Sequence, residues 1–256
     1  MVLWPTCGEA TIQYRPATPQ RPPGQEPSAR GRARDKSARQ SASRIRRYTV
    51  HNALGFMPTL TFRHEPESLR GVEAACKDFA RKLIRAGIDG PYLWVPERGS
   101  KNDRLHVHWL CSWWRRLGAV EVCERCASSG LRKVRSDIPP AGSLCIGCLW
   151  GHGFVGAPSE AVGDPLKAAG YVSKYVSKEL VGLVDFGRHR YHVARGHQPE
   201  PVRATFWSFQ DAYLGLMGHQ GNPTDLTALH EVVEDWDAPM TWALRFDLER
   251  GRPDAE

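Results

Sequence analysis

The chain has 256 residues, of which 41% are hydrophobic, enough for one sizeable domain with appendages or two small ones. No apolar run approaches the ~20 residues that a membrane span needs, and the N-terminus lacks the features of a signal peptide. We therefore expect a soluble, cytoplasmic protein without a membrane partner. The net charge of +7 comes from residues 1–47, which hold ten Lys or Arg and three Asp or Glu, while the remainder holds 25 of each.

The N-terminal segment 1–47 is rich in Pro, Gly and Ser as well as in Arg, and it has few aliphatic residues. Such a composition cannot bury enough apolar surface to offset the entropy of ordering, so it predicts a disordered basic arm. A flexible basic arm attracts polyanions through the release of counterions. A solubilising segment that has no partner is the alternative.

The central part of the chain predicts alternating strands and helices. The pattern indicates a strand in 56–66, a helix in 68–87, a β-hairpin from 91 to 114 around the turn-forming SKND, a short strand in 149–157 and a helix at 171–180. In the helix 68–87, the apolar residues at helical spacing are Val72, Ala75, Phe79, Leu83 and Ile84. This order predicts an α+β fold with a central antiparallel sheet and flanking helices, compatible with a ferredoxin-like or RRM-like layout. Residues 201–256 are expected to be mostly helical.

The stretch LHVHWL contains two histidines, His106 and His108, one residue apart. On a strand this spacing directs both imidazoles to one face and their neighbours to the other. Glu97 precedes them on the other arm of the predicted hairpin, so strand pairing brings its carboxylate near the two rings. Two imidazoles and a carboxylate with open positions suit Mg²⁺ or Mn²⁺ shared with phosphate oxygens.

The stretch YVSKYVSKEL repeats a Tyr-x-x-Lys pattern within eight residues. On a helix, Tyr171 and Tyr175 share one face with Lys174 and Lys178 beside them, while Val172 and the later apolar residues take the opposite side. A packed helix with half-buried tyrosines and extended lysines gives the same pattern, and a lone Tyr-x-x-Lys does not distinguish the two.

Two Cys-x-x-Cys pairs lie between the histidine strand and the tyrosine helix. They are Cys123 with Cys126 and Cys145 with Cys148, separated by 18 residues. This spacing predicts a four-cysteine zinc ribbon inserted at about 120–149, because thiolates are soft ligands that favour Zn²⁺. Four unrelated buried cysteines are the alternative. Cys7, Cys76 and Cys111 have no partner pattern and are interpreted as ordinary thiols.

Taken in chain order, LTF at 60–62, Glu97 before His106-Val-His108, and the later Tyr-x-x-Lys resemble the three motifs of the HUH endonucleases that initiate rolling-circle replication. The doubled YVSKYVSK is most similar to the two-tyrosine initiators of small single-stranded DNA phages and related plasmids. The resemblance covers about residues 50–195. The long insertion at 120–149 departs from the family pattern.

The resemblance implies a DNA-nicking and joining enzyme that acts in the cytoplasm of a bacterial host. Tyr171 and Tyr175 would attack single-stranded origin DNA, forming a 5′-phosphotyrosyl link and a free 3′-OH, with Lys174 and Lys178 assisting and Glu97, His106 and His108 holding Mg²⁺ or Mn²⁺. No P-loop sequence occurs, so a host helicase and polymerase are the expected partners. The implied domains are 1–47, an endonuclease domain at 48–200, and 201–256 of unknown role.

Other functions remain open at this stage. An HUH transposase or a conjugative relaxase would share the chemistry. A non-enzymatic zinc-ribbon DNA-binding regulator would bind DNA without cleaving it.

Overall fold

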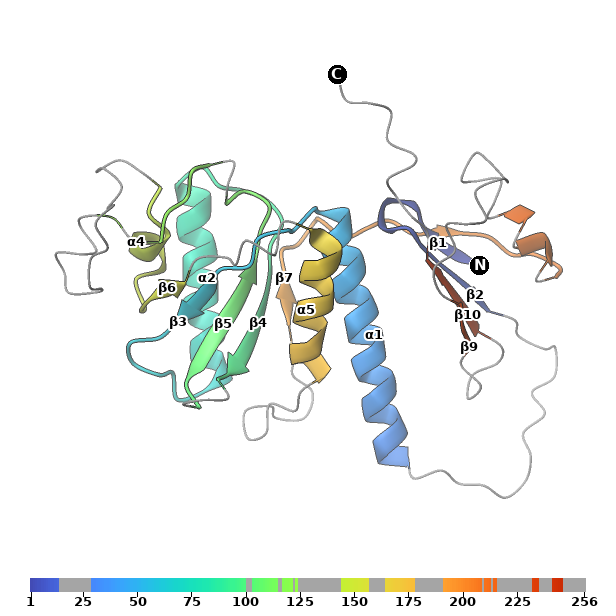
Figure 1. The fold of residues 1–256 in the computed structure, drawn as a ribbon, viewed down its shortest axis with the longest axis horizontal. Coiled ribbons are helices and arrows are strands. Elements are labelled where there is room, and N and C mark those ends of the chain that lie inside the picture. The colour runs from blue at the N-terminus through green and yellow to red at the C-terminus, as the bar shows by residue number, and fades with distance from the viewer. Residues whose placement is uncertain are drawn as a thin grey trace. The chain divides into compact units, whose positions relative to one another are not determined.

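The computed structural model describes residues 1–13, 29–99, 103–114, 117–121, 123, 144–156, 164–177, 191–208, 210–212, 214–215, 232–234 and 241–245. The chain divides into two compact units (Figure 1). One comprises Lys36–His197, and the other comprises Met1–Asp35 together with Gln198–Glu256.

The unit Lys36–His197 is built around a five-stranded antiparallel sheet with the order β6-β3-β5-β4-β7. Its strands are β3 (Thr59–Thr61), β4 (Leu93–Arg98), β5 (Leu105–Leu110), β6 (Val155–Gly156) and β7 (His192–Val193). Its helices are α2 (Leu69–Arg85), α4 (Ile146–Trp150), α5 (Pro165–Ser177) and most of α1 (Ala29–His51). The predicted α+β architecture with antiparallel pairing and flanking helices is therefore confirmed, although α4 occupies the first part of the segment predicted as a strand at 149–157.

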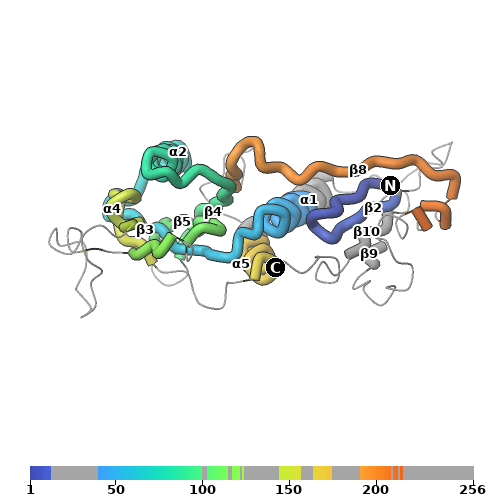
Figure 2. The backbone as a smooth tube through the Cα atoms, turned by 90° about the horizontal axis from the view of Figure 1, so that it is seen from above, coloured from blue at the N-terminus to red at the C-terminus, as the bar shows by residue number. Residues whose placement is uncertain are grey.

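Helix α2 covers one face of this sheet (Figure 2). Ser68 caps its first turn by accepting a hydrogen bond from Gly71 N, and Gly87 ends it with a left-handed φ of 77°. The buried face of the helix packs against Val107 and Trp109 of β5. Ile84, which was expected in this core, is instead 53% exposed, because it lies at the edge of the apolar stripe in the last turn.

Helices α1 and α5 pack together on the opposite face of the sheet. Ile45 and Tyr48 of α1 form one buried cluster with Ala168 and Val172 of α5 and with residues of β4 and β5. The Tyr48 hydroxyl donates a hydrogen bond to the Ala194 carbonyl oxygen at 3.2 Å, which ties α1 to the segment after β7. Burial raises the pKa of Tyr48 above its usual range, so this phenol remains a neutral donor.

The second unit has its own antiparallel sheet, with the order β8-β1-β2-β10-β9. Its elements are β1 (Val2–Trp4), the 3₁₀ turn η1 (Pro5–Cys7), β2 (Glu9–Gln13), β8 (Val202–Arg203), β9 (Val232–Glu234) and β10 (Thr241–Arg245). The first and last described strands of the chain thus belong to one sheet, because β10 pairs with β2 and β2 pairs with β1.

Two predictions need correction here. Residues 2–13 and 29–47 form strands, a 3₁₀ turn and part of α1, so they are not the disordered arm that composition predicted. The segment 201–256 contributes three strands and is not mostly helical in its described part. In both cases the strands find their partners at the other end of the chain, and composition within a short window carries no signal for such pairing.

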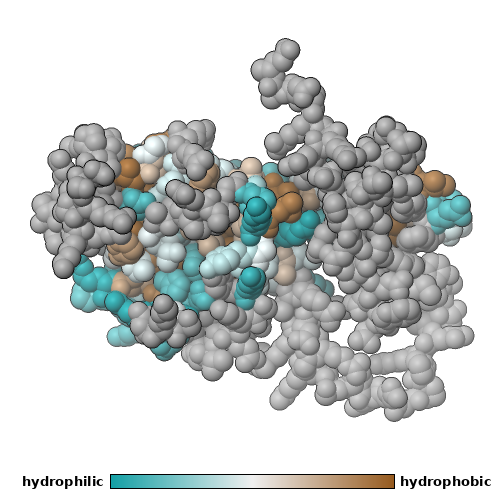
Figure 3. Space-filling model, viewed as in Figure 1, coloured by the Kyte–Doolittle hydropathy of each residue, from teal (hydrophilic) through white to brown (hydrophobic). Residues whose placement is uncertain are grey.

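On the face seen in Figure 3, hydrophobic residues occur in small separate groups among hydrophilic ones. No helix among the described residues is long and apolar enough to cross a membrane.

Candidate metal centres and the tyrosine helix

The pairing of β4 with β5 brings together the three predicted metal ligands. The register places Glu97 directly opposite His106, and His108 lies two residues further along β5 on the same face. The intervening side chains turn to the other face, where Leu105 and Val107 are buried in the core under α2. Strand alternation therefore separates the histidines from the core as the sequence predicted.

The Glu97 carboxylate lies between the two imidazoles. Its Oε2 is 3.2 Å from His106 Nε2 and 2.7 Å from His108 Nε2. A divalent ion with ligands at about 2.1 Å requires neighbouring ligand atoms to be about 3 Å apart in an octahedron. The observed separations bracket that value, so the donor set fits one small, hard cation with positions left for other ligands.

Groups behind the two rings hold them in this orientation. His106 Nδ1 lies 3.2 Å from the Arg104 carbonyl oxygen, and His108 Nδ1 lies 3.5 Å from Thr59 Oγ1 on the paired strand β3. A carbonyl oxygen can only accept, so Nδ1 of His106 carries the proton and Nε2 is left as the ligand atom. Such supporting contacts are typical of histidines that bind metals.

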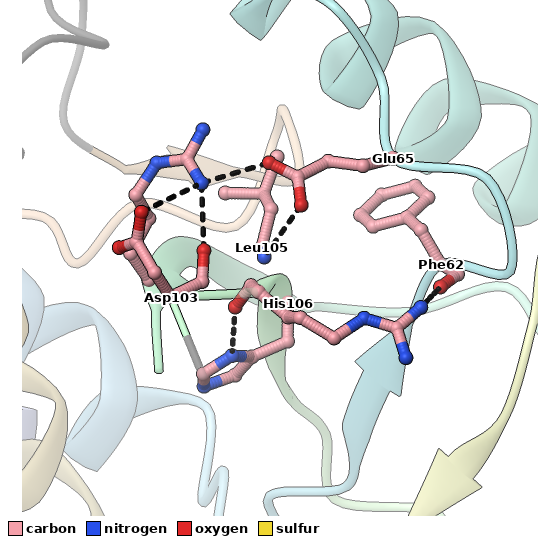
Figure 4. A network of polar contacts seen from close by, with 7 residues as sticks. Phe62, Glu65, Asp103, Leu105 and His106 are labelled. Atoms are coloured by element: carbon pink, nitrogen blue, oxygen red, sulfur yellow. Dashed lines mark hydrogen bonds and ion pairs between the residues drawn. The ribbon is translucent and has the colours of Figure 1, made fainter. Parts of the chain in front are cut away.

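The start of β5 is held by a polar network (Figure 4). Arg98 pairs with Glu65 at 2.8 Å, and the other carboxylate oxygen of Glu65 accepts from Leu105 N at 3.5 Å. The Arg104 guanidinium donates to the Phe62 carbonyl oxygen at 3.0 Å. These contacts connect the segment after β3 to the β4–β5 hairpin, and so they stabilise the strand positions on which the ligand geometry depends.

Helix α5 brings one tyrosine close to this group. The ring of Tyr171 lies edge-to-face against His108, with the centroids 6.3 Å apart, and Tyr171 is 43% exposed. Lys174 Nζ lies 5.9 Å from the centre of the Tyr171 ring. Val172, on the opposite side of the helix, is fully buried, so the amphipathic arrangement predicted for the tyrosine helix is present in its described part.

The remaining predicted members of the tyrosine repeat are described only in part. The backbone of Tyr175 is helical and lies one turn after Tyr171, but its side chain lies outside the described residues. Lys178 also lies outside them.

A second metal-binding group is formed by three cysteines, Cys123, Cys145 and Cys148. The sulfur atoms of Cys123 and Cys148 are 3.6 Å apart, and Cys145 Sγ accepts a hydrogen bond from Cys148 N at 3.4 Å as it caps α4. Four thiolates at about 2.3 Å around Zn²⁺ would be about 3.8 Å from one another. The geometry is compatible with a zinc site, and the predicted fourth ligand, Cys126, lies outside the described residues.

Sequence reasoning did not find Thr59 or the contact between Tyr171 and His108. A signal for Thr59 existed, because PTLTF alternates and so directs Thr59 away from the buried Leu60. No local signal exists for the contact of Tyr171 with His108, which depends on how α5 packs against the sheet.

A family model of replication-associated proteins, the ORF2 family, matches residues 55–180. The match is just under half of the chain, and it includes all three predicted ligands of the Mg²⁺ or Mn²⁺ site and both tyrosines. It supports a rolling-circle replication initiator that binds origin DNA. No curated protein and no solved structure gives a significant match.

Proposed function

We propose that this protein initiates rolling-circle replication by nicking and rejoining single-stranded origin DNA through a tyrosine nucleophile. The observation that carries this proposal is the contact between Tyr171 and His108, because it combines a partly exposed phenol with a group of metal ligands. The match of residues 55–180 to replication-associated proteins supports the biological role.

In this proposal Glu97, His106 and His108 hold Mg²⁺ or Mn²⁺ through one carboxylate oxygen and two Nε2 atoms. When bound, the cation would polarise the scissile phosphate and lower the cost of the negative charge that develops on it. The supporting contacts of Arg104 and Thr59 keep both rings turned toward the shared position.

Tyr171 supplies the nucleophilic oxygen. Its phenol attacks the phosphorus atom, a Tyr–O–P bond forms, and the P–O3′ bond breaks. The phenolic proton is lost, and the leaving 3′ oxygen is protonated to become a free 3′-OH that a polymerase can extend. Lys174 is close enough to the Tyr171 ring to offset charge on the reacting phosphate.

Tyr175 is proposed as the second nucleophile, with Lys178 beside it. Rolling-circle replication needs a second cleavage when the replication fork returns to the origin while the first tyrosine is still bound to DNA. Helical positions four apart are neighbours, about 5–6 Å between Cβ atoms, so a second phenol could attack at the same cation.

The cysteine group is proposed to be the remainder of a four-thiolate structural zinc site that includes Cys126. Such a site would stabilise the insertion locally. The expected partners are single-stranded origin DNA, a host helicase and a polymerase, in the cytoplasm of a bacterium that carries the phage or plasmid.

The experiment compares four proteins, namely the wild type, Tyr171→Phe, Tyr175→Phe and the double variant. Each is incubated with labelled single-stranded DNA from its own replicon and Mn²⁺, and the covalent adduct is trapped and mapped by peptide mass spectrometry. We expect an adduct on the surviving tyrosine in each single variant and none in the double variant. DNA binding by the wild type without any adduct would overturn the proposal and favour a non-enzymatic regulator. Loss of all adduct in one single variant would limit the proposal to one nucleophile.

A further inference from the structure

The exposed face of α5 extends one turn N-terminal to Tyr171. Lys167, Gly170, Tyr171 and Lys174 are all exposed and fall within an arc of about 100° on the helix. Ala168, Ala169 and Val172 on the other side are completely buried. The segment before Tyr171 therefore presents a continuous outer surface made of two lysines, a glycine and the proposed nucleophile.

Gly170 is not required by the fold of the chain. Glycine is the least favourable residue in a helix interior after proline. Gly170 is not among the glycines with positive φ, and a Cβ atom placed on it would meet nothing within 4 Å. By contrast, a Cβ atom on Gly153 would overlap backbone atoms of β3 and the segment after it. An alanine would thus fit at position 170, so the bare backbone there suits the close approach of another molecule.

The charges on this face favour a polyanion. Lys167 and Lys174 are seven residues apart, which corresponds to about 10 Å along the helix axis. That separation is too long for both ammonium groups to bind one phosphate, but it suits groups spaced along a nucleic-acid strand. Helix α5 contains no acidic residue, and within the described parts of the chain no carboxylate forms an ion pair with Lys167.

The N-terminus of α5 does not provide the anion site. Asp164 precedes the helix, and its Oδ1 accepts a hydrogen bond from Leu166 N at 2.8 Å. A carboxylate at this end satisfies a helix donor and repels a phosphate. The lysines on the outer face are therefore the groups on α5 that would attract the strand.

We propose that Lys167 and Gly170 form a binding surface for the sugar-phosphate backbone of the DNA strand next to the scissile phosphate. The strand would pass over Gly170 in van der Waals contact, with a neighbouring phosphate paired to Lys167. This inference rests on the proposed function, because the strand must reach Tyr171. Both residues would position the strand, and neither contacts the reacting atoms.

The test uses Gly170→Ala, Gly170→Gln and Lys167→Gln in the full chain, with single-stranded oligonucleotides of the replicon as the probe. Gly170→Ala should raise Tm by about 2–4 °C, because alanine favours a helix. The same variant should weaken DNA binding about threefold and Gly170→Gln about tenfold, with KM rising more than kcat falls. Lys167→Gln should reduce the salt dependence of binding by about one counterion, and Lys167→Arg should restore it.

Gly90→Ala is the matched control, because Gly90 also lacks a positive φ and has open space around its Cβ position. It should leave DNA binding unchanged. If Gly170→Gln is misfolded by circular dichroism, Gly170→Ala and Lys167→Gln decide the matter. Wild-type affinity in the folded variants, with cleavage intact, would overturn this inference alone. Absence of any cleavage by the wild type would instead overturn the proposed function as well.

Discussion

The two metal-binding groups in the unit Lys36–His197 are assembled in different ways. Glu97, His106 and His108 project from paired strands whose register sets their spacing. Cys123, Cys145 and Cys148 come from a chain segment and the start of the short helix α4. The first group is supported by a sheet that folds around its own core, whereas the second lies in a small satellite cluster with Val120.

This difference indicates different roles. A ligand group on a rigid sheet can lose its cation without losing its fold, as a reaction site requires. A loop-bound thiolate group depends on its cation for local order, as a structural zinc site does. The predictions below test this contrast.

The largest effect is expected from His106→Ala combined with His108→Ala. Loss of a histidine's supporting contacts alone typically costs 10- to 100-fold, so loss of two ligands should lower the nicking rate by at least about 100-fold. The unfolding midpoint in urea should change little, since both rings are directed away from the core under α2. A variant that nicks at the wild-type rate in Mg²⁺ or Mn²⁺ would show that these residues are not the ligands.

Cys148→Ser should have the opposite profile. The Cys148 side chain is exposed, so the substitution itself removes little packing, but it removes a thiolate. Zinc measured by elemental analysis should fall from about one per chain to nearly none, and Tm should fall by several degrees. Nicking at low temperature should stay within a few-fold of the wild type. The double histidine variant serves as the control and should retain its zinc; a zinc-free wild type that is fully folded would contradict the structural assignment.

Gly153→Ala tests the connection between the two groups. Trp150 of α4 donates to the Thr61 carbonyl oxygen at 2.7 Å, and a Cβ atom on Gly153 would overlap that oxygen and lie 2.8 Å from Arg63 N. We expect a loss of about 1–3 kcal/mol in the free energy of unfolding, measured by urea denaturation. Gly156→Ala is the matched control, because its Cβ would lie 3.6 Å from its nearest neighbour. Equal stability of both variants would argue against this close contact.

The smallest effect is expected at Asp78 of α2, which lies 2.7 Å from Lys82 and 3.8 Å from His152. The hydrogen bond from Lys82 holds the pKa of Asp78 below its usual value. A carboxyl with a lowered pKa in the folded state contributes stability above its unfolded pKa of about 3.9, and this contribution is lost as the pH falls through the folded pKa.

We therefore expect Asp78→Asn to lower the free energy of unfolding by about 0.5 kcal/mol at pH 7, because the partly exposed pair is screened by solvent. The difference from the wild type should shrink when urea denaturation is repeated near pH 3. A difference that grows on acidification would contradict the assigned direction of the shift.

Short-range periodicity in the sequence was sufficient to predict several features. The alternation of LHVHWL places the histidines opposite the core residues, and the period of α2 and α5 identifies their buried faces, apart from Ile84. The hairpin that aligns Glu97 with His106 could also be predicted, because its two strands are close in sequence. Each of these features depends on residues separated by no more than about a dozen positions.

Only the tertiary structure decided how distant segments meet. Tyr171 contacts His108 because Val172 and Ala168 pack against Ile45 and Tyr48 of α1 and the sheet, across long separations in the sequence. β2 is ordered because it pairs with β10, although the composition of residues 1–47 predicted disorder. Such contacts are favoured by burial and backbone pairing that only the folded chain provides, so no window of local sequence contains them.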